Sequence, residues 1–599
     1  MRLRLLLLVL LTMLPLAGCG LFGSDPKDAA DAFLAALAGG DVTAAGRLTD
    51  QPAEATRLIK DVRGELRPRR VELTLGQVRS GGDTASATYS ARWDLGGQRQ
   101  WRYQGQLDLV PSDNDQGWSV RWSPAALYPT LAAQQHLELR TVPPDPAPVV
   151  DRTGTPLLTA QTVVTVALNR AKAGDLAGVA GTLAGALTQF DPKITQQSIV
   201  EGANATPPGQ PSVVAVLREQ DYQSVRDRIY DLPGVTFPSQ QRLLAPDRGF
   251  ASPLVPGLRT VVENELAGAA GWQIVTVDAV GGKVAELAGQ PPRPVPTLTT
   301  TVDRATQAAA EDAVNTVPNA ATIVAIQPST GQIMAVAQNA AADAQGPIAL
   351  TGRFPPGSTF KIVTAAAALQ SGKVTLDSPV ACPGTTTVQG RVIPNEDRFD
   401  LGTVPLRTAF ARSCNTTFAQ LAAGFSPGQL TEAAHQMGIG MDYRIPGITT
   451  LTGSVPPSSS VVQRAEDGFG QGQVLTTPFG MALAAATVAH GGQAPTPSLI
   501  SGMPTQTATA PGAPVPAAVA GTLGVMMREV VTQGTGKSLL GAGDLHGKTG
   551  TAEINPTDAH GWFVGYRGDL AFATLVVDAG TSGPALAVSG RFLSTVNPS

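Results

Sequence analysis

Three short groups of residues have the types that serine acyl transfer requires, and they occur in a fixed order along the chain. Ser358 precedes Lys361 by three positions in the stretch PPGSTFK. Ser413 and Asn415 follow in RSCNTTF, and Lys548 opens the stretch KTGT. A serine hydroxyl is a weak nucleophile until a base accepts its proton, and residues three apart share one face of a helix. Lys361 is therefore the first candidate for the base that activates Ser358.

The Ser-x-x-Lys pair alone is weak evidence, because short motifs also arise by chance in long chains. The alternative interpretation is an ordinary helix start with a surface lysine. Two further groups in this order, each preceded by a turn rich in Gly or Pro, favour the chemical interpretation. We therefore expect one active site assembled from all three groups.

The three groups resemble the active-site set of the penicillin-binding proteins and serine β-lactamases. The resemblance continues over residues 299–590, through stretches such as TVDRATQ, GQGQVLTTPFGMALAAATVAHGG and VVTQGTGKS. On these residues the chain is identified as a member of the class B penicillin-binding proteins, of a lipid-anchored type similar to those of actinobacteria. The resemblance implies a C-terminal transpeptidase domain in which an antiparallel sheet is flanked by helices.

The resemblance also implies a role for each catalytic residue. Lys361 would act as the base of acylation, although the identity of that base is disputed for the β-lactamases. Ser413 would relay a proton among Lys361, Lys548 and the leaving amine. Asn415 would bind the amide backbone of the substrate, and Lys548 would supply positive charge. The dipole of the helix that begins at Ser358 would favour developing negative charge.

The KTGT stretch implies a strand that binds the substrate. The hydroxyls of Thr549 and Thr551 would hold the terminal carboxylate of a D-Ala-D-Ala stem peptide or of a penicillin. The backbone N–H groups of Ser358 and Thr551 would form the oxyanion hole. Gly550, which has no side chain, would let the strand come close to the ligand.

These roles describe a peptidoglycan D,D-transpeptidase. Ser358 attacks a pentapeptide stem, D-Ala leaves, and the acyl group passes to an amine on a neighbouring stem, while β-lactam antibiotics acylate and block the same serine. Two alternatives stay open. One is a D,D-carboxypeptidase or β-lactamase of the same fold, which gives the acyl group to water, and the other is a penicillin-binding scaffold of the division or elongation machinery. The resemblance implies no cofactor, and it suggests a glycosyltransferase of that machinery as a partner.

Other features have weaker chemical interpretations. The stretch QGTGKS resembles the end of a phosphate-binding loop, but Val531 stands where that pattern requires Gly. By strand alternation His546 lies on the same side as Lys548, either at the rim of the cleft or as a polar edge residue, and the sequence favours the edge residue. Five scattered histidines, and cysteines without metal-ligand spacing, predict no metal site.

The chain contains three cysteines. Cys382 and Cys414 lie within the region of resemblance, and in an oxidising compartment we expect a disulfide between them. The alternative is two buried free thiols that act as small apolar residues. Cys19 follows the small residues Ala17 and Gly18, in a pattern that resembles a bacterial lipobox. We expect Cys19 to be lipidated, and the alternative is a signal cleaved by an ordinary peptidase with Cys19 incidental.

Residues 1–18 predict a lipoprotein signal peptide. Arg2 and Arg4 precede an apolar stretch, Leu5–Leu16, that is too short to span a bilayer as a mature helix. Because no other apolar run of about 18 residues follows, we expect a soluble ectodomain on the extracytoplasmic face of the membrane, tethered through residues 19–27. The formal net charge of −4 argues against a nucleic-acid partner.

The length of 599 residues suffices for several domains, and we expect a multi-domain α+β chain. Residues 28–136 combine helical spacing, broken at Gly39 and Gly40, with four alternating stretches that predict antiparallel strands. They resemble the nuclear-transport-factor-two-like cone at the front of some penicillin-binding proteins. Residues 137–295 predict an extended, irregular pedestal of the dimerisation type with one helical subdomain. Residues 299–595 would form the transpeptidase domain.

Shorter stretches predict local structure. DRTGTPL, residues 151–157, resembles the Asp-Arg-x-Gly element that opens the pedestal of class B proteins, although these residues alone favour a plain hairpin turn. The prolines of residues 289–303 predict an extended linker. Ala305–Val314 predict an amphipathic helix, and TIVAIQPSTGQIMAVAQ predicts two strands around a Pro-Ser-Thr-Gly turn.

Overall fold

The computed structural model describes residues 25–115, 117–279, 282–508, 512–555 and 558–596. The predicted signal peptide and the lipidation of Cys19 lie outside the described residues. The chain divides into two compact units, the first made of residues up to 144 with 269–294 and the second of 145–268 with 295–599. Among the helices of the described residues, none combines the length and the apolar composition that crossing a membrane requires.

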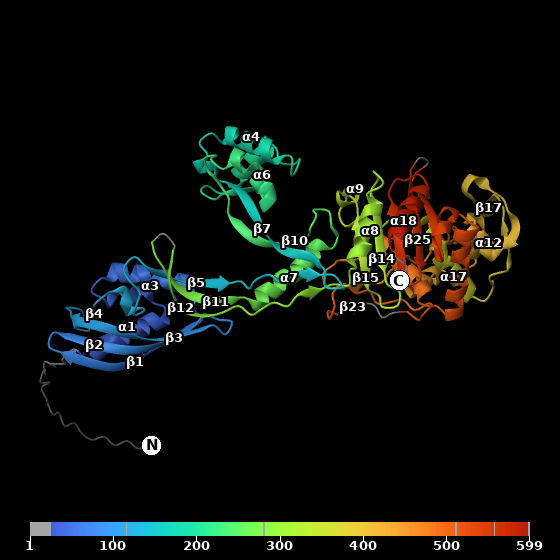
Figure 1. Ribbon diagram of the computed structural model, residues 1–599. Coiled ribbons are helices and arrows are strands. Elements are labelled where there is room, and N and C mark those ends of the chain that lie inside the picture. The colour runs from blue at the N-terminus through green and yellow to red at the C-terminus, as the bar shows by residue number, and fades with distance from the viewer. Residues whose placement is uncertain (1–24, 116, 280–281, 509–511, 556–557, 597–599) are drawn as a thin grey trace, which may run out of the picture. The chain divides into compact units, whose positions relative to one another are not determined.

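The described residues of the first unit form three helices packed against antiparallel strands. One sheet has the order β1-β2-β3-β4, and a second has the order β12-β11-β5 (Figure 1). Buried and exposed residues alternate along β2 and β3 because one face of the sheet covers the core, where Trp93 and Trp101 lie. The elements are α1 (Pro26–Gly39), α2 (Val42–Arg47), α3 (Pro52–Leu66), β1 (Arg70–Gly81), β2 (Thr84–Asp94), β3 (Gln100–Pro111), β4 (Trp118–Val120), β5 (His136–Val142), β11 (Gly271–Val277) and β12 (Lys283–Gln290).

Helix boundaries in this unit follow local sequence signals. Gly40 ends α1 in the left-handed conformation, with φ at +83°. Asp41 caps α2 by accepting the N–H of Ala44 at 2.9 Å. Helix α3 lies beyond the helical stretch predicted from the sequence, although Pro52 stands at its first position and its buried residues recur at helical spacing.

Residues 145–268 of the second unit form a sheet around the long strand β7, together with a small helical cluster. Strand β7 pairs with β6, β8, β9 and β10. The segment is more regular than its Pro and Gly content predicts, because most of these residues lie in turns between elements. Of the stretch predicted as one pedestal, β5, β11 and β12 lie in the first unit and the following elements in the second. They are β6 (Val149–Val150), β7 (Pro156–Leu168), α4 (Leu176–Leu187), α5 (Gln196–Ala205), β8 (Ser212–Arg218), α6 (Glu219–Ile229), β9 (Val235–Thr236), β10 (Ser239–Leu244) and α7 (Val255–Ala269).

Asp151 closes the turn between β6 and β7. Its carboxylate accepts the backbone N–H groups of Thr153 and Thr155, each at 2.8 Å. The same carboxylate accepts the N–H of Arg304 at 3.3 Å, at the start of helix α8. The Asp-Arg-x-Gly stretch is therefore a hairpin turn whose aspartate also fastens the beginning of the transpeptidase region.

That region is built on a five-stranded antiparallel sheet of order β15-β14-β26-β25-β24. Helices α8 and α18 pack on one face, and α16 and α17 pack on the other, where α11 packs against α17. Strands β14 and β26 are buried along their whole length because helices cover both faces. The predicted hairpin of β14 and β15 is present.

The bounds of the remaining elements are as follows. They are β13 (Leu298–Thr299), α8 (Arg304–Val314), β14 (Ala321–Ile326), β15 (Ile333–Gln338), α9 (Ala340–Asp343), α10 (Ile348–Thr351), α11 (Lys361–Gln370), β16 (Pro379–Cys382), β17 (Thr385–Val388), β18 (Arg391–Pro394), β19 (Gly402–Pro405), α12 (Leu406–Ala411), α13 (Asn415–Ala423), α14 (Gln429–Gln436), β20 (Tyr443–Arg444), β21 (Gly453–Ser454), α15 (Val461–Asp467), β22 (Leu475–Thr476), α16 (Pro478–Ala489), β23 (Gln506–Thr507), α17 (Ala517–Thr532), β24 (Leu545–Glu553), β25 (Ala559–Arg567), β26 (Leu570–Val576) and α18 (Gly583–Thr595).

Candidate active site

Ser358 lies in a single 3-10 turn, Gly357–Phe360, and Lys361 is the first residue of α11. The sequence predicts both residues on one helix, whereas in the structure the serine precedes the α-helix. A 3-10 turn has three residues per turn, so residues three apart still eclipse each other. Lys361 Nζ lies 2.9 Å from Ser358 Oγ, within the reach that proton transfer requires.

Two glycines allow the turn that carries Ser358 to lie against strand β24. Gly357 has φ at +53°, and a Cβ atom there would lie 2.5 Å from the carbonyl oxygen of Thr551. Its N–H donates to the carbonyl oxygen of Gly470 at 2.9 Å. A Cβ atom on Gly470, where φ is +81°, would lie 1.9 Å from the carbonyl oxygen of Gly357. The nucleophile turn is thus held between β24 and the Gly470 loop with no space for a side chain.

The Ser-x-Asn group encloses the amine of Lys361. Besides Ser358 Oγ, Lys361 Nζ contacts the carbonyl oxygen of Ser413 at 2.8 Å and Asn415 Oδ1 at 2.6 Å. Asn415 Nδ2 in turn donates to the carbonyl oxygen of Pro394 at 3.2 Å, which fixes the amide. Asn415 therefore orients Lys361, in addition to the substrate contact that the sequence predicts for it.

Ser413 has an unusual backbone conformation. Its φ of +62° is left-handed, which costs a residue with a side chain about 1–3 kcal/mol. The next residue, Cys414, forms a disulfide with Cys382, and their Cα atoms lie 6.1 Å apart. The disulfide ties the start of α13 to β16 directly beside the strained serine.

Lys548 is fully buried within β24 and lies on the same side as the nucleophile. Its Nζ donates to Ser413 Oγ at 2.9 Å and to the carbonyl oxygen of Thr549 at 2.9 Å. Ser413 Oγ also lies 3.3 Å from Lys361 Nζ. One hydroxyl therefore contacts both lysines, which is the geometry that a proton relay needs.

Burial governs the charge of the two lysines. Burial lowers the pKa of Lys361 well below its ordinary value, and the neighbouring charge of Lys548 lowers this pKa further. Burial also lowers the pKa of Lys548, to about 7. The negative charge of Glu396 opposes both shifts. Two ammonium groups beside one hydroxyl repel each other, so the arrangement favours a neutral Lys361 next to a cationic Lys548.

Two buried phenylalanines that the sequence analysis did not single out lie beneath the lysines. Lys361 Nζ is 5.7 Å from the ring centre of Phe418, and Lys548 Nζ is 5.8 Å from that of Phe410. The rings exclude water from both amines, and their faces attract whichever amine is charged. Phe418 lies in the SCNTTF stretch, so its proximity to the motif was an available signal.

The rest of the KTGT group shapes the edge of the sheet. A Cβ atom placed on Gly550 would lie 2.9 Å from the carbonyl oxygen of Pro356. The absence of a side chain therefore lets β24 pack closely against the nucleophile turn, whereas the sequence predicts a close approach to the ligand. Thr549 Oγ1 lies 2.5 Å from the hydroxyl of Thr535, which belongs to the QGTGKS stretch. Alternation places Thr549 and Thr551 opposite the side of Lys548. In the described part of the chain β24 pairs only with β25, so its outer edge is open.

His546 connects β24 to a neighbouring helix. Its ring stacks on that of Tyr566, with centres 4.6 Å apart. Its Nδ1 lies 2.8 Å from the carbonyl oxygen of Gly524 on α17. These contacts give the histidine a structural role at the edge of the sheet.

Comparison with known proteins yields two family matches. The model described as penicillin binding protein transpeptidase domain matches residues 321–596, and the model described as NTF2-like N-terminal transpeptidase domain matches residues 25–135. The predicted cone and transpeptidase folds are therefore confirmed.

Several characterised relatives were found. The peptidoglycan D,D-transpeptidase PbpA of Mycolicibacterium smegmatis is 32% identical over 350 residues, which cover 49% of this chain and 70% of that protein. PbpA of Mycobacterium tuberculosis is 29% identical over 41% of this chain and 58% of its own length. Penicillin-binding protein 3 of Bacillus subtilis is 25% identical over 80% of both chains.

A serine hydroxyl in contact with a buried lysine, beside a sheet flanked by helices, is an arrangement typical of serine acyltransferases. With the two family matches and these relatives, the chain belongs to the class B penicillin-binding proteins. Its activity is that of a serine D-Ala-D-Ala transpeptidase in peptidoglycan synthesis, which takes place on the extracytoplasmic side of the membrane.

Proposed function

We propose that Ser358 is the acylated residue and that Lys361 is the base. The observation that supports this proposal is the 2.9 Å contact between Lys361 Nζ and Ser358 Oγ, made by an amine whose pKa is lowered by burial. Lys361 takes the hydroxyl proton as Oγ bonds to the carbonyl carbon of the penultimate D-Ala. A neutral amine can accept that proton, whereas an ammonium cannot.

Ser413 and Lys548 complete the acylation step. When the tetrahedral adduct collapses, the bond between carbon and nitrogen breaks and the terminal D-Ala leaves as an amine. The proton passes from Lys361 through Ser413 Oγ to that amine, because this hydroxyl contacts both lysines. The amine of a second stem peptide then attacks the ester and releases Ser358 in the cross-linked product.

The open edge of β24 is the proposed position of the donor stem peptide. An extended peptide there would meet Thr549 and Thr551 with its terminal carboxylate, and the N–H groups of Ser358 and Thr551 with its reacting carbonyl. A bound carboxylate would raise the pKa of Lys548 from about 7, because an opposite charge favours the ammonium. Substrate binding thus charges Lys548 and keeps Lys361 neutral.

Mass spectrometry after penicillin treatment tests the assignment. We expect one adduct per chain, mapped to Ser358, and no adduct in Ser358→Ala. Ser371→Ala, at the end of the same helix α11, is the matched control and should label as the wild type does. An adduct on another residue, or undiminished labelling of Ser358→Ala, would overturn the proposal.

Transfer to an amine is favoured over transfer to water. Rapid hydrolysis needs a base that aims water at the ester, which class A β-lactamases supply from a Glu-x-x-Leu-Asn loop. Between Asn415 and Lys548 the glutamates are Glu432, Glu466 and Glu529, and none lies in that pattern. Glu466 forms an ion pair with an arginine, Arg391, at 2.7 Å. Product analysis with a D-amino acid as acceptor separates the two reactions, and free acid as the sole product would establish a carboxypeptidase.

We also propose that Cys19 carries a lipid that holds the protein at the membrane, where a glycosyltransferase would supply the glycan strands. The support is the small-residue pattern before Cys19 after an apolar stretch. Cys19→Ala should release the protein from the membrane fraction and remove a lipid-sized mass from its N-terminal peptide. Membrane retention without that mass difference would contradict the anchor.

A further inference from the structure

A cavity of about 650 Å³ lies beside strand β8, in the segment 145–268 and far in sequence from the catalytic groups. Its size is typical of ligand sites. Every residue of β8 from Val213 to Arg218 lines it, whereas the side chains of a strand point alternately to opposite faces. The cavity therefore reaches the edge of β8, and from there it extends over β7 and β10, which contribute Val163, Arg242 and Leu244.

That edge is open and apolar. In the described residues β8 pairs only with β7, so its other side has no partner strand. Val213 and Val216 expose 67% and 42% of their surfaces, the former being the most exposed of the large apolar residues described. Proteins normally cover or charge such an edge, because it accepts any extended chain.

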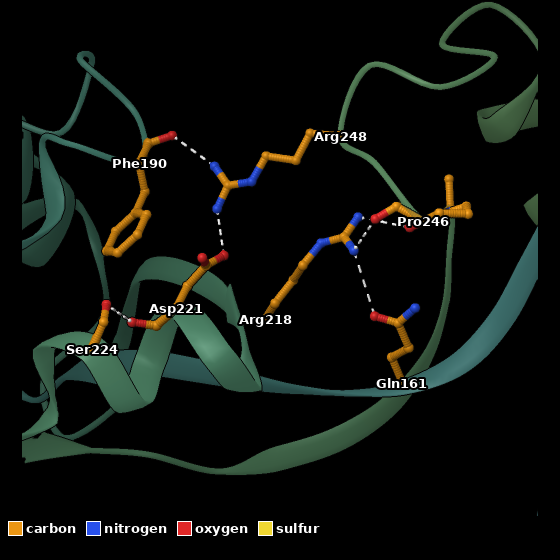
Figure 2. Close-up of polar contacts among 8 residues, drawn as sticks. Gln161, Phe190, Arg218, Asp221, Ser224, Pro246 and Arg248 are labelled. Carbon is orange, nitrogen blue, oxygen red and sulfur yellow. Dashed lines mark hydrogen bonds and ion pairs between the residues drawn. The ribbon is translucent and has the colours of Figure 1, made fainter. Parts of the chain in front are cut away.

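Arginines supply positive charge around the same cavity. Arg218, Arg242 and Arg259 line it together with the carboxylates of Asp191 and Asp247. In the described residues no carboxylate forms an ion pair with any of these three arginines, and with Arg248 the arginines outnumber the two aspartates. Arg218 donates only to neutral oxygens, at 2.8 Å to Ala245 and 3.0 Å to Pro246 (Figure 2). The Nε of Arg259 is buried without a hydrogen-bond partner in the described structure.

A fourth arginine holds the cavity's walls together. Figure 2 shows Arg248, on the loop after β10, reaching the carbonyl oxygen of Phe190 and the carboxylate of Asp221. Arg218 reaches in the opposite direction, from β8 to that loop. Arg248 thus holds the loop against the helical cluster and Arg218 holds it against β8, so the cavity is formed before any ligand arrives.

We propose that the outer edge of β8 binds an extended acidic segment of another extracytoplasmic protein, which adds to the sheet as a strand. Main-chain hydrogen bonds to the open edge would give affinity, and the arginines would select negative charge. Val216 and Arg218 lie two positions apart and so on one face of β8. The segment should therefore carry an apolar and an acidic residue two positions apart.

Two synthetic decapeptides test the proposal on the full ectodomain. Each peptide carries a fluorescent label and has Thr at every second position. At the remaining positions the first peptide alternates Val with Glu, and the second peptide alternates Val with Lys. We expect the Glu peptide to bind at least tenfold more tightly by fluorescence polarisation. Amide hydrogen exchange should slow in Val213–Arg218 when the Glu peptide binds.

Charge reversal supplies the matched variants. The double variant Arg242→Glu, Arg259→Glu should bind the Glu peptide at least tenfold more weakly. The control variant Arg57→Glu, Arg102→Glu, at two exposed positions of the first unit, should change the affinity for this peptide less than twofold. Unchanged acylation by penicillin shows that both variants fold. Equal binding of the two peptides, no binding of either, an unchanged affinity in the first variant, or unprotected β8 amides would each overturn the proposal. Competition by inorganic phosphate without β8 protection would identify a simple anion site instead.

Discussion

Replacing Gly470 by alanine should slow acylation far more than it lowers stability. The carbonyl oxygen of Gly470 accepts the N–H of Gly357, one residue before the nucleophile. A Cβ atom on Gly470 would lie 1.9 Å from the carbonyl oxygen of Gly357, and contacts under 3.0 Å do not persist in proteins. The nucleophile turn, or the loop, must therefore move by about 1 Å.

The magnitude follows from that displacement. A shift of 1 Å in a reacting group can cost about 100-fold in rate, so we expect acylation of Gly470→Ala to fall by about that factor. Left-handed backbone at alanine costs about 1–2 kcal/mol of folding free energy in addition. The thermal unfolding midpoint should fall by a few degrees only.

Gly502→Ala is the matched control. Its φ of +79° nearly equals the +81° of Gly470, but no atom lies within 4 Å of a Cβ atom placed there. Both variants thus carry the same backbone strain, and only one disturbs Ser358. The assay is the second-order rate constant for labelling by a fluorescent penicillin, with thermal unfolding measured in parallel. Rate constants that agree within twofold between the variants would refute the idea that the Gly470 loop positions the nucleophile.

Three further predictions concern charge, covalent structure and turnover. Glu396→Gln removes the negative charge that raises the pKa of Lys361 and of Lys548, so both pKa values should fall. In a plot of acylation rate against pH, the acidic limb should therefore move to lower pH. No movement, or movement to higher pH, would contradict a neutral Lys361 as base. Replacing Cys382 and Cys414 together by alanine should lower the free energy of unfolding in urea by about 4 kcal/mol, and a loss below about 1 kcal/mol would show that the reduced chain is already constrained. Purified protein should give one burst of chromogenic cephalosporin cleavage per chain; sustained hydrolysis at many turnovers per second would make it a β-lactamase.

The sequence predicts those parts of the site that depend on local pattern. Each reactive group stands at or near the start of an element and follows a turn, which is why its order and residue types are visible without a structure. The hairpin of β14 and β15 and the strands of the first unit were likewise predictable from alternation. The disulfide partners could be proposed because only two thiols remain after Cys19.

The features that could not be predicted depend on contacts between distant segments. The backbone of Ser413 is left-handed although the residue is not a glycine, so its residue type does not predict this conformation. The role of Gly470 arises from a contact with Gly357, far away in the chain. The charge of Lys361 depends on burial over Phe418 and on the proximity of Lys548, and neither follows from spacing.

The strand order of the catalytic sheet determines when during synthesis the enzyme can become active. Strand β14 pairs with β26, and Ala321 lies opposite Val576. A strand that is synthesised early can therefore pair only after a much later segment has been made. Such long-range pairing slows folding, and Lys548 belongs to the same late segment. A chain that stops before β26 should therefore be inert toward penicillin. Stem peptides in the wall would meet the reactive serine only after the sheet is complete, which protects them from an incompletely folded transpeptidase.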